Sequence, residues 1–210
     1  MSFLTEEFQR AGQLSGLFFD GEHADGINNS SLSVIKAFLL GKELNFGKKN
    51  YQVVGSETHL RILEPRKKST LLPDVDESMV TNMVTAAKNC KSLQELLKNS
   101  KREILCHSII NGVKVRGTLD ILKGKKGGDL KTTICGDEIE FYTKAIEYDY
   151  PRQAVFYSNM QKLNSFVFYG LQKKYPFQVY TMHMEDFPKE MRAAKDEMEF
   201  LLYFYQKYIL

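Results

Sequence analysis

The centre of the chain alternates apolar and polar residues with a period of two, which predicts three consecutive β-strands. Two alternating runs cover residues 102–110 and 113–122, and a third run covers residues 128–133. The sequence KGKKGG separates the second run from the third and predicts a tight turn. We therefore predict a meander of three strands that ends in a hairpin.

Helical spacing predicts α-helices on both sides of these strands. A short helix is expected over SVIKAFLLGK, capped by Ser31 or Ser33, and a longer one from about Glu77 to Lys98. The segment FYTKAIEYDYPRQAVFYSNMQKLN predicts a helix with a break before Pro151, because proline disfavours the α conformation in the residue ahead of it. Two further strands, SFVFYGLQ and FQVYTMHM, precede a terminal helix that Pro188 opens. This order of elements predicts one mixed sheet surrounded by helices.

The composition fits a single domain with a short arm. Residues 1–30 are rich in Gly and polar residues and predict an N-terminal arm, whereas residues 31–210 predict one compact domain in a chain that is 43% hydrophobic. The chain has no apolar run near the ~20 residues that a membrane span needs. Its start, MSFLTEEFQRAGQ, has an acid pair, Glu6 and Glu7, where a signal peptide would have basic residues. We therefore expect a cytoplasmic protein without membrane contact.

Cysteines and net charge narrow the chemistry only slightly. The 3 cysteines show no CxxC spacing, which argues against a disulfide framework, a zinc ribbon and a four-cysteine iron–sulfur cluster. A net charge of +3 does not by itself indicate a nucleic-acid partner. The lysines of the chain gather in predicted turns. There they would either bind phosphates or keep a sheet edge soluble.

Two aspartates and one lysine lie at close spacing in the predicted hairpin. Asp120 shares a strand face with Thr118, away from the apolar residues, and Asp129 shares a face of the next strand with Lys131. Mg2+ and Mn2+ prefer oxygen ligands, and Mg2+ commonly takes one or two carboxylates together with substrate phosphate. A lysine two residues after a ligand is placed to orient or deprotonate a metal-bound water. The pattern indicates a hydrolytic site for phosphodiesters; the alternative is a surface hairpin whose charges are only solvated.

Three further motifs surround this hairpin in a fixed order. Residues 55–59 read GSETH, residues 63–65 read LEP, and residues 153–157 read QAVFY. The ordered set covers about half of the chain. It resembles the PD-(D/E)XK nuclease superfamily, and within it the RecE-like (exonuclease VIII-type) and RecB-like exonucleases. The resemblance implies a restriction-endonuclease-like fold, an α/β (mixed α+β) architecture in which helices flank a central mixed β-sheet.

The resemblance also implies a role for each residue of the motifs. His59, Asp120 and Asp129 would bind Mg2+ or Mn2+ together with the backbone carbonyl of Leu130. Lys131 would act in catalysis beside the two aspartates. By the residues alone, the default for His59 is a histidine satisfied in a partly buried helix, so the ligand role rests on the whole set of motifs.

Gln153 and Tyr157 lie four residues apart, hence on one helix face. The resemblance implies that they brace the site or contact the DNA backbone, whereas an aromatic residue at this spacing is often part of a core. Two acidic residues remain open. Glu57 stands beside His59, and Glu103 lies in the strand before the hairpin, so either carboxylate could join the metal ligands.

The implied activity is that of a Mg2+-dependent DNA exonuclease that hydrolyses phosphodiester bonds of linear double-stranded DNA in phage-type or recombination-linked processing. Similar proteins work with a single-strand annealing protein, and several form homo-oligomeric rings around DNA. Two alternatives stay open: a structure-specific or restriction-like endonuclease, and a non-catalytic DNA-binding or assembly protein that retains the fold. The intact Asp120, Asp129 and Lys131 favour an enzyme, since repulsion within an unused charged cluster costs stability.

Overall fold

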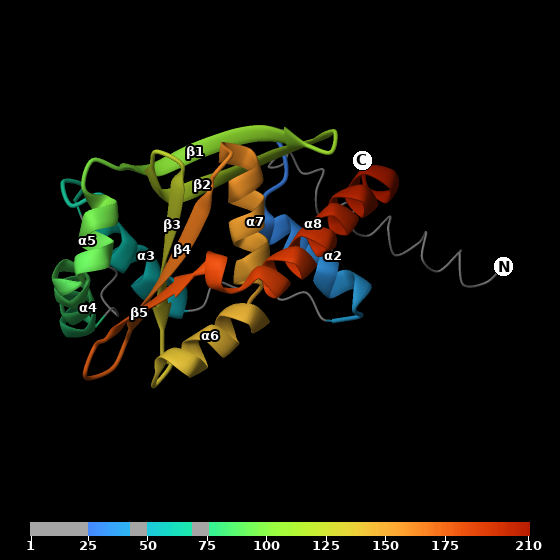
Figure 1. Cartoon of the computed structure of the whole chain (residues 1–210). Coiled ribbons are helices and arrows are strands. Elements are labelled where there is room, and N and C mark those ends of the chain that lie inside the picture. The colour runs from blue at the N-terminus through green and yellow to red at the C-terminus, as the bar shows by residue number, and fades with distance from the viewer. Residues whose placement is uncertain (1–24, 43–49, 69–75) are drawn as a thin grey trace.

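The fold is built on one five-stranded sheet with helices on both sides (Figure 1). The structure is a computed structural model and describes residues 25–42, 50–68 and 76–210. Its elements, in chain order, are α2 (Asn29–Leu39), α3 (Asn50–Leu63), α4 (Glu77–Asn89), α5 (Lys91–Leu97), β1 (Lys101–Ile110), β2 (Val113–Lys123), β3 (Lys126–Thr133), α6 (Glu138–Glu147), α7 (Tyr150–Gln161), β4 (Ser165–Gln172), β5 (Val179–His183), the 3-10 turn η1 (Met184–Asp186) and α8 (Pro188–Tyr208).

The sheet is mixed, as the sequence predicts. Its strand order is β1-β2-β3-β4-β5, with β3 and β4 parallel and the other neighbours antiparallel. Two parallel strands need a crossover connection, and α6 and α7 provide it between β3 and β4. The predicted fold class, a mixed sheet flanked by helices, is therefore confirmed.

Two apolar cores pack against opposite faces of the sheet. One contains buried residues of α2, α6, α7 and α8, and the other contains buried residues of α3, α4 and α5. Figure 1 shows α4 and α5 on one side of the sheet and α7 and α8 on the other. Phe168 and Tyr169 are neighbours in β4 yet belong to different cores, as expected for a strand that is buried on both faces. The terminal helix α8 buries Leu201 and Leu202 in the first core, so these two residues of the helix serve the core.

A charge network buried beside the first core connects α2, α7 and α8. The Arg152 side chain is only 1% exposed. Its guanidinium donates hydrogen bonds to Glu197 Oε1 at 2.6 Å and to Ser33 Oγ. Lys36 Nζ lies 2.6 Å from Asp149 Oδ1 and 2.7 Å from Glu197 Oε2. The buried Arg152 thus has half-buried partners of opposite sign, as burial of a charge requires.

Two local predictions were wrong in detail. The cap of α2 is Asn28, whose side chain accepts a hydrogen bond from the Ser31 backbone N–H, while the Ser31 side chain bonds back to the Asn28 backbone. Ser31 thus completes a capping box from the third helical position. The single helix predicted for residues 77–98 is two helices, because the backbone at Cys90 is extended, with φ −77° and ψ 102°.

The end of the predicted N-terminal arm packs against the sheet. Ile27 is fully buried and pairs in parallel with Val115, on the edge of β2 that β3 leaves free. Residues 1–24 of the arm lie outside the described residues. Within the described parts of the chain, the helices are too short or too polar to cross a membrane.

Candidate active site

The candidate site lies where β2 and β3 separate. The two strands pair at only three positions, and Ile121 opposite Gly128 is the last pair before they diverge. Asp120 and Asp129 are the next residues along each strand, and they are 8% and 3% exposed. Because the ladder ends there, two carboxylates enter a gap that a continued sheet would fill with backbone hydrogen bonds.

One wall of this gap is helix α3. Asp120 Oδ2 accepts a hydrogen bond from the Leu130 backbone N–H at 2.8 Å and lies 3.5 Å from His59 Nδ1. Gly55 of the same helix faces β3, where a Cβ would stand 3.4 Å from Thr132 Oγ1, which is close to an ordinary van der Waals contact. The GSETH motif thus lies on the part of α3 that packs on β3.

Three side chains form a group that could hold a cation. The ligand atoms of His59, Glu103 and Asp120 all lie within 4.8 Å of one another. Glu103 faces Asp120 across the β1–β2 ladder, between the pairs Arg102–Ile121 and Ile104–Leu119. Its φ is +48°, a left-handed conformation that costs a non-glycine residue about 1–2 kcal/mol. Strained residues of this kind cluster at functional sites.

Asp129 lies outside this group of three and has different partners. Its Oδ1 accepts a hydrogen bond from Gln153 Nε2 at 2.6 Å, and its Oδ2 lies 2.7 Å from Lys131 Nζ. That contact is an ion pair without good hydrogen-bond geometry, so the buried Oδ2 accepts no proper hydrogen bond from the described residues. An under-satisfied buried carboxylate oxygen has free lone pairs for a ligand. A role of Asp129 as a metal ligand stays a prediction.

Burial sets the protonation of the three grouped side chains. Burial, and after it the charge of Asp129, raises the pKa of Asp120 well above its ordinary value. Burial raises the pKa of Glu103 too, helped by Glu64 and Asp129. Burial lowers the pKa of His59, which favours the neutral imidazole that metals bind. A divalent cation would relieve the repulsion among these carboxylates, so the donor set, one imidazole nitrogen and carboxylate oxygens, fits a metal such as Mg2+ or Mn2+.

Lys131 is held between Asp129 and two aromatic rings. Its Nζ lies 5.1 Å from the centroid of the Tyr150 ring and 5.8 Å from that of Phe168, and these two rings stack on each other. The side chain is 24% exposed. Cation–π contacts and the ion pair together fix the ammonium next to the carboxylates while leaving part of it accessible.

The QAVFY motif contributes one contact at the site and one behind it. Gln153 holds Asp129, as described above, and so braces the carboxylate that pairs with Lys131. Tyr157 is 7% exposed and donates its hydroxyl to the Thr118 carbonyl at 2.7 Å. Its ring covers Gly117, where a Cβ would lie 3.0 Å from the ring. In this structure Tyr157 packs α7 onto β2. Contact of Gln153 or Tyr157 with DNA stays a prediction.

Of the two acids that the sequence left open, the structure places Glu103 in the cluster and Glu57 elsewhere. The Glu57 carboxylate lies 2.6 Å from Arg61 Nε, one helical turn along α3. Arg61 also donates two hydrogen bonds to Glu77, at 2.6 and 2.7 Å. Glu57 is therefore part of a link between α3 and α4. The i,i+4 spacing of Glu57 and Arg61 is the sequence signal that indicates this pairing.

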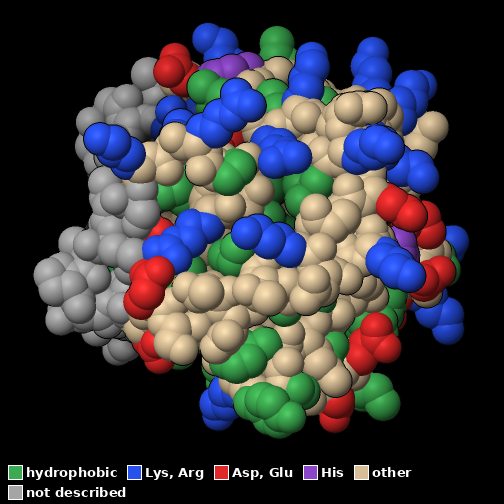
Figure 2. Space-filling view, turned by 90° about the vertical axis from the view of Figure 1, so that its left-hand side faces the viewer, with side chains coloured by type: hydrophobic (Ala, Val, Ile, Leu, Met, Phe, Trp, Pro, Cys, Tyr) green, Lys and Arg blue, Asp and Glu red, His purple; other side chains and the backbone are tan. Residues whose placement is uncertain are grey.

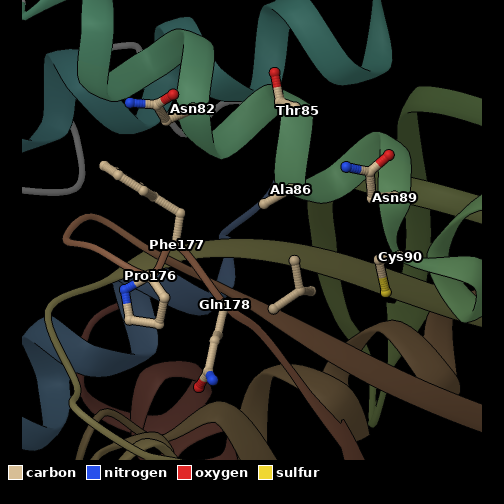
Figure 3. A pocket seen from close by; sticks show the side chains of 9 residues that line it. Asn82, Thr85, Ala86, Asn89, Cys90, Pro176, Phe177 and Gln178 are labelled. Carbon is tan, nitrogen blue, oxygen red and sulfur yellow. The ribbon is translucent and has the colours of Figure 1, made fainter.

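The surface beyond the site is unevenly charged. Figure 2 shows Lys and Arg side chains gathered over the upper half of one face, with Asp and Glu mainly along its sides. A separate groove of about 500 Å³ lies between α4 and the turn joining β4 to β5. In Figure 3, Phe177 and Pro176 of that turn face Asn82 and Ala86. None of the described residues lining it is a carboxylate, lysine or histidine, so it lacks the chemistry of the β2–β3 gap.

The central strands of this mixed sheet diverge and bring two aspartates and a lysine together, and a glutamine on the crossover helix braces one of the aspartates. These features define the class of PD-(D/E)XK nuclease folds. The chain belongs to the family described as PDDEXK-like domain of unknown function (DUF3799), whose model matches residues 37–207. The resemblance found in the sequence is thereby confirmed. No curated protein matches the chain.

The chain is similar to solved structures at low sequence identity. An exonuclease candidate from Eubacterium rectale superposes with a TM-score of 0.60 and 14% identity, covering 87% of this chain and 81% of that one. At this identity the likeness establishes the fold alone. A phage-related exonuclease from Haemophilus somnus gives a TM-score of 0.45 at 14% identity and covers 83% of each chain.

Proposed function

We propose that this protein is a Mg2+-dependent deoxyribonuclease that degrades linear double-stranded DNA from its ends. The observation that supports the proposal is the placement of the His59, Glu103 and Asp120 group beside the ion pair of Asp129 and Lys131. Nuclease chemistry needs a cation site and a group that handles the attacking water within reach of one phosphate, and the gap between β2 and β3 offers both.

In the proposed mechanism each side chain has one task. His59, Glu103 and Asp120 hold the cation, with Asp129 and the Leu130 carbonyl as the further ligands that the sequence predicts. Mg2+ bound there would supply positive charge to the scissile phosphate and to a water. Lys131 would orient that water for in-line attack as an ammonium or, as a neutral amine, would accept its proton, while the new P–O bond forms and the bond to the 3′ oxygen breaks. Gln153 fixes Asp129 and, through it, Lys131.

We favour an end-dependent exonuclease over the alternatives for two reasons. The motifs resemble those of RecE-like exonucleases, and the structural neighbour from Eubacterium rectale is described as an exonuclease candidate. By the same resemblance we propose a role in phage-type or recombination-linked DNA processing, with a single-strand annealing protein as partner and a homo-oligomer as the working form. A restriction-like endonuclease and a non-catalytic DNA-binding protein are the competing readings.

The decisive experiment compares linear duplex DNA with covalently closed circles in Mg2+. We expect loss of the linear DNA, intact circles, and no degradation by Asp120→Asn, because that variant loses a charged cation ligand. Asp196→Asn, an exposed position on α8, is the control and should retain full activity. Cleavage of circles would establish an endonuclease instead. DNA binding without cleavage in Mg2+ or Mn2+ would establish the non-catalytic alternative.

A second prediction separates Glu103 from Glu57. Glu103→Gln should weaken Mg2+ or Mn2+ binding by more than about tenfold, because it removes one charged oxygen ligand. Glu57→Gln should leave cation affinity unchanged, since Glu57 pairs with Arg61. Isothermal titration of both variants with Mn2+ measures the difference. A loss of affinity in Glu57→Gln alone would show that the cation sits elsewhere.

Cation affinity should also rise with pH. The ligating carboxylates must be deprotonated, and the pKa values of Asp120 and Glu103 are both raised. Protons therefore compete with the cation at a higher pH than they do at ordinary carboxylates. Repeating the Mn2+ titration at several pH values should show weaker binding toward acid pH.

A further inference from the structure

We propose that Tyr148 is a stacking platform for a nucleobase of the DNA that lies at the candidate site. This inference rests on the proposed function, because it assigns a ligand to the surface next to the same lysine. Tyr148 follows the end of α6 and is 65% exposed. A tyrosine that leaves most of its ring in water offers an open π-face, and every base can stack on one.

A row of aromatic rings connects Tyr148 with the candidate catalytic lysine. The Tyr148 and Tyr150 ring centroids lie 6.2 Å apart. Lys131 Nζ lies 5.1 Å from the centroid of the Tyr150 ring. Tyr150 therefore contacts both Tyr148 and the lysine that pairs with Asp129. The Tyr148 ring is thus connected to Lys131 through one intervening ring, that of Tyr150. We place the base next to the scissile phosphate along this short row of rings.

The backbone holds Tyr148 in a fixed position. Its N–H donates to the Lys144 carbonyl at 2.9 Å, and the next residue, Asp149, donates its N–H to the Ile146 carbonyl at 3.1 Å. Asp149 has a φ of +59°, so the chain turns sharply between α6 and α7. Ion pairs from Lys36 and Arg152 hold the Asp149 side chain at 2.6 and 3.3 Å. A ring presented by so constrained a turn loses little conformational entropy on binding.

The charges around Tyr148 point to stacking rather than to a phosphate contact. Lys144 pairs with Glu147 at 2.7 Å, and Lys36 pairs with Asp149 and Glu197. The nearby cations are therefore already neutralised by carboxylates. A base, which is flat and uncharged, suits such a surface better than the DNA backbone does. Stacking of this kind is tolerant of sequence, so we expect little preference among the four bases.

The test uses fluorescence of 2-aminopurine placed in the DNA end, with Lys131→Met as the background so that the DNA is not cut. We expect quenching at one nucleotide beside the scissile position in the parent and in Tyr148→Phe. In Tyr148→Ala the quenching should be lost and the affinity for the DNA end should fall roughly tenfold. Tyr203→Ala, at a 54% exposed tyrosine on α8, is the control and should behave like the parent.

The outcomes separate this inference from the proposed function. If the protein with Lys131 intact cuts DNA but Tyr148→Ala keeps both the quenching and the affinity, the stacking role is wrong and the nuclease assignment stands. If the protein with Lys131 intact neither cuts nor binds DNA, both are wrong. Equal losses in Tyr148→Phe and Tyr148→Ala would show that the hydroxyl, rather than the ring, makes the contact, and would also overturn the proposal.

Discussion

Replacing Lys131 with methionine is expected to lower kcat for DNA hydrolysis by about 10²–10⁴-fold, the usual contribution of a positioned proton-transfer group. The ammonium lies 2.7 Å from Asp129 Oδ2 and is accessible beside the candidate cation group. Methionine keeps the apolar stem that contacts Tyr150 and Phe168 but cannot orient or deprotonate a water. Initial rates at saturating linear DNA measure the effect.

The same variant should remain folded and should still bind Mn2+, because the imidazole and carboxylate ligands are unchanged. Lys126→Met is the matched control: Lys126 is exposed, lies on the same strand, and pairs with Lys123 and Ser165 rather than with the site. It should retain close to full kcat. If Lys131→Met and Lys126→Met were equally active, Lys131 would have no part in catalysis.

Arg152→Met is expected to lower the free energy of unfolding by about 1.5–3 kcal/mol, the usual contribution of hydrogen bonds to a charged group, because the carboxylates that it leaves behind are only half-buried. The guanidinium is 1% exposed and bonds to Glu197, Ser33 and Asn29. Without it, Glu197 and Asp149 keep only Lys36 as a cationic partner among the contacts described above, and two polar side chains lose their donor. Equilibrium unfolding in urea measures the loss. The dependence of the unfolding free energy on urea concentration, the m-value, is held at the value of the parent protein.

Lys195→Met gives the comparison for an exposed ion pair on α8. Lys195 and Glu199 are 59% and 47% exposed and stand 3.9 Å apart, so the variant should change the free energy of unfolding by less than about 1 kcal/mol. A double variant, Arg152→Met with Glu197→Leu, should recover part of the lost stability, since it no longer leaves that carboxylate without its partner. Equal effects of Arg152→Met and Lys195→Met would show that the buried network adds no stability.

Local sequence patterns were sufficient for most of the fold. Period-two alternation located β1 and β2 to within about one residue, and the break before Pro151 appears as the turn between α6 and α7. The pattern was insufficient at Cys90, where no proline or glycine marks the end of α4. The helix stops there because the backbone turns to an extended conformation that lets α5 pack Leu93 and Leu96 onto the second core. Such a stop depends on tertiary packing and leaves no local signal.

For the candidate site, the motifs predict residues that the structure brings close together, but they do not predict the contacts between them. The resemblance groups His59 with Asp120, and the structure has them 3.5 Å apart. The resemblance assigns Asp129 to the same cation, which stays a prediction, while the contacts of Asp129 with Lys131 and Gln153 come from the structure. Strand alternation cannot predict this, because it gives the face of a strand and not the direction in which two strands diverge.

Glu103 shows most clearly what sequence patterns omit. Its position opposite Asp120 follows from the register of β1 and β2, which depends on the turn between them. Its entry into the cation group also accompanies a left-handed backbone, which non-glycine residues rarely adopt. The Arg152 network is similar, because its members come from three helices far apart in the chain.

The candidate site lies between the two apolar cores. His59 is on α3, which packs on one core, and Gln153 is on α7, which packs on the other. A cation held by His59, Glu103 and Asp120 would fasten α3 to the β1–β2 ribbon. Without the cation, α3 would be able to open separately from the first core. With the cation bound, amide hydrogens of α3 would exchange with solvent only when the cation leaves or the whole molecule unfolds. Loading of the site would therefore enlarge the slowest-exchanging unit of the protein and make α3 harder for proteases to reach.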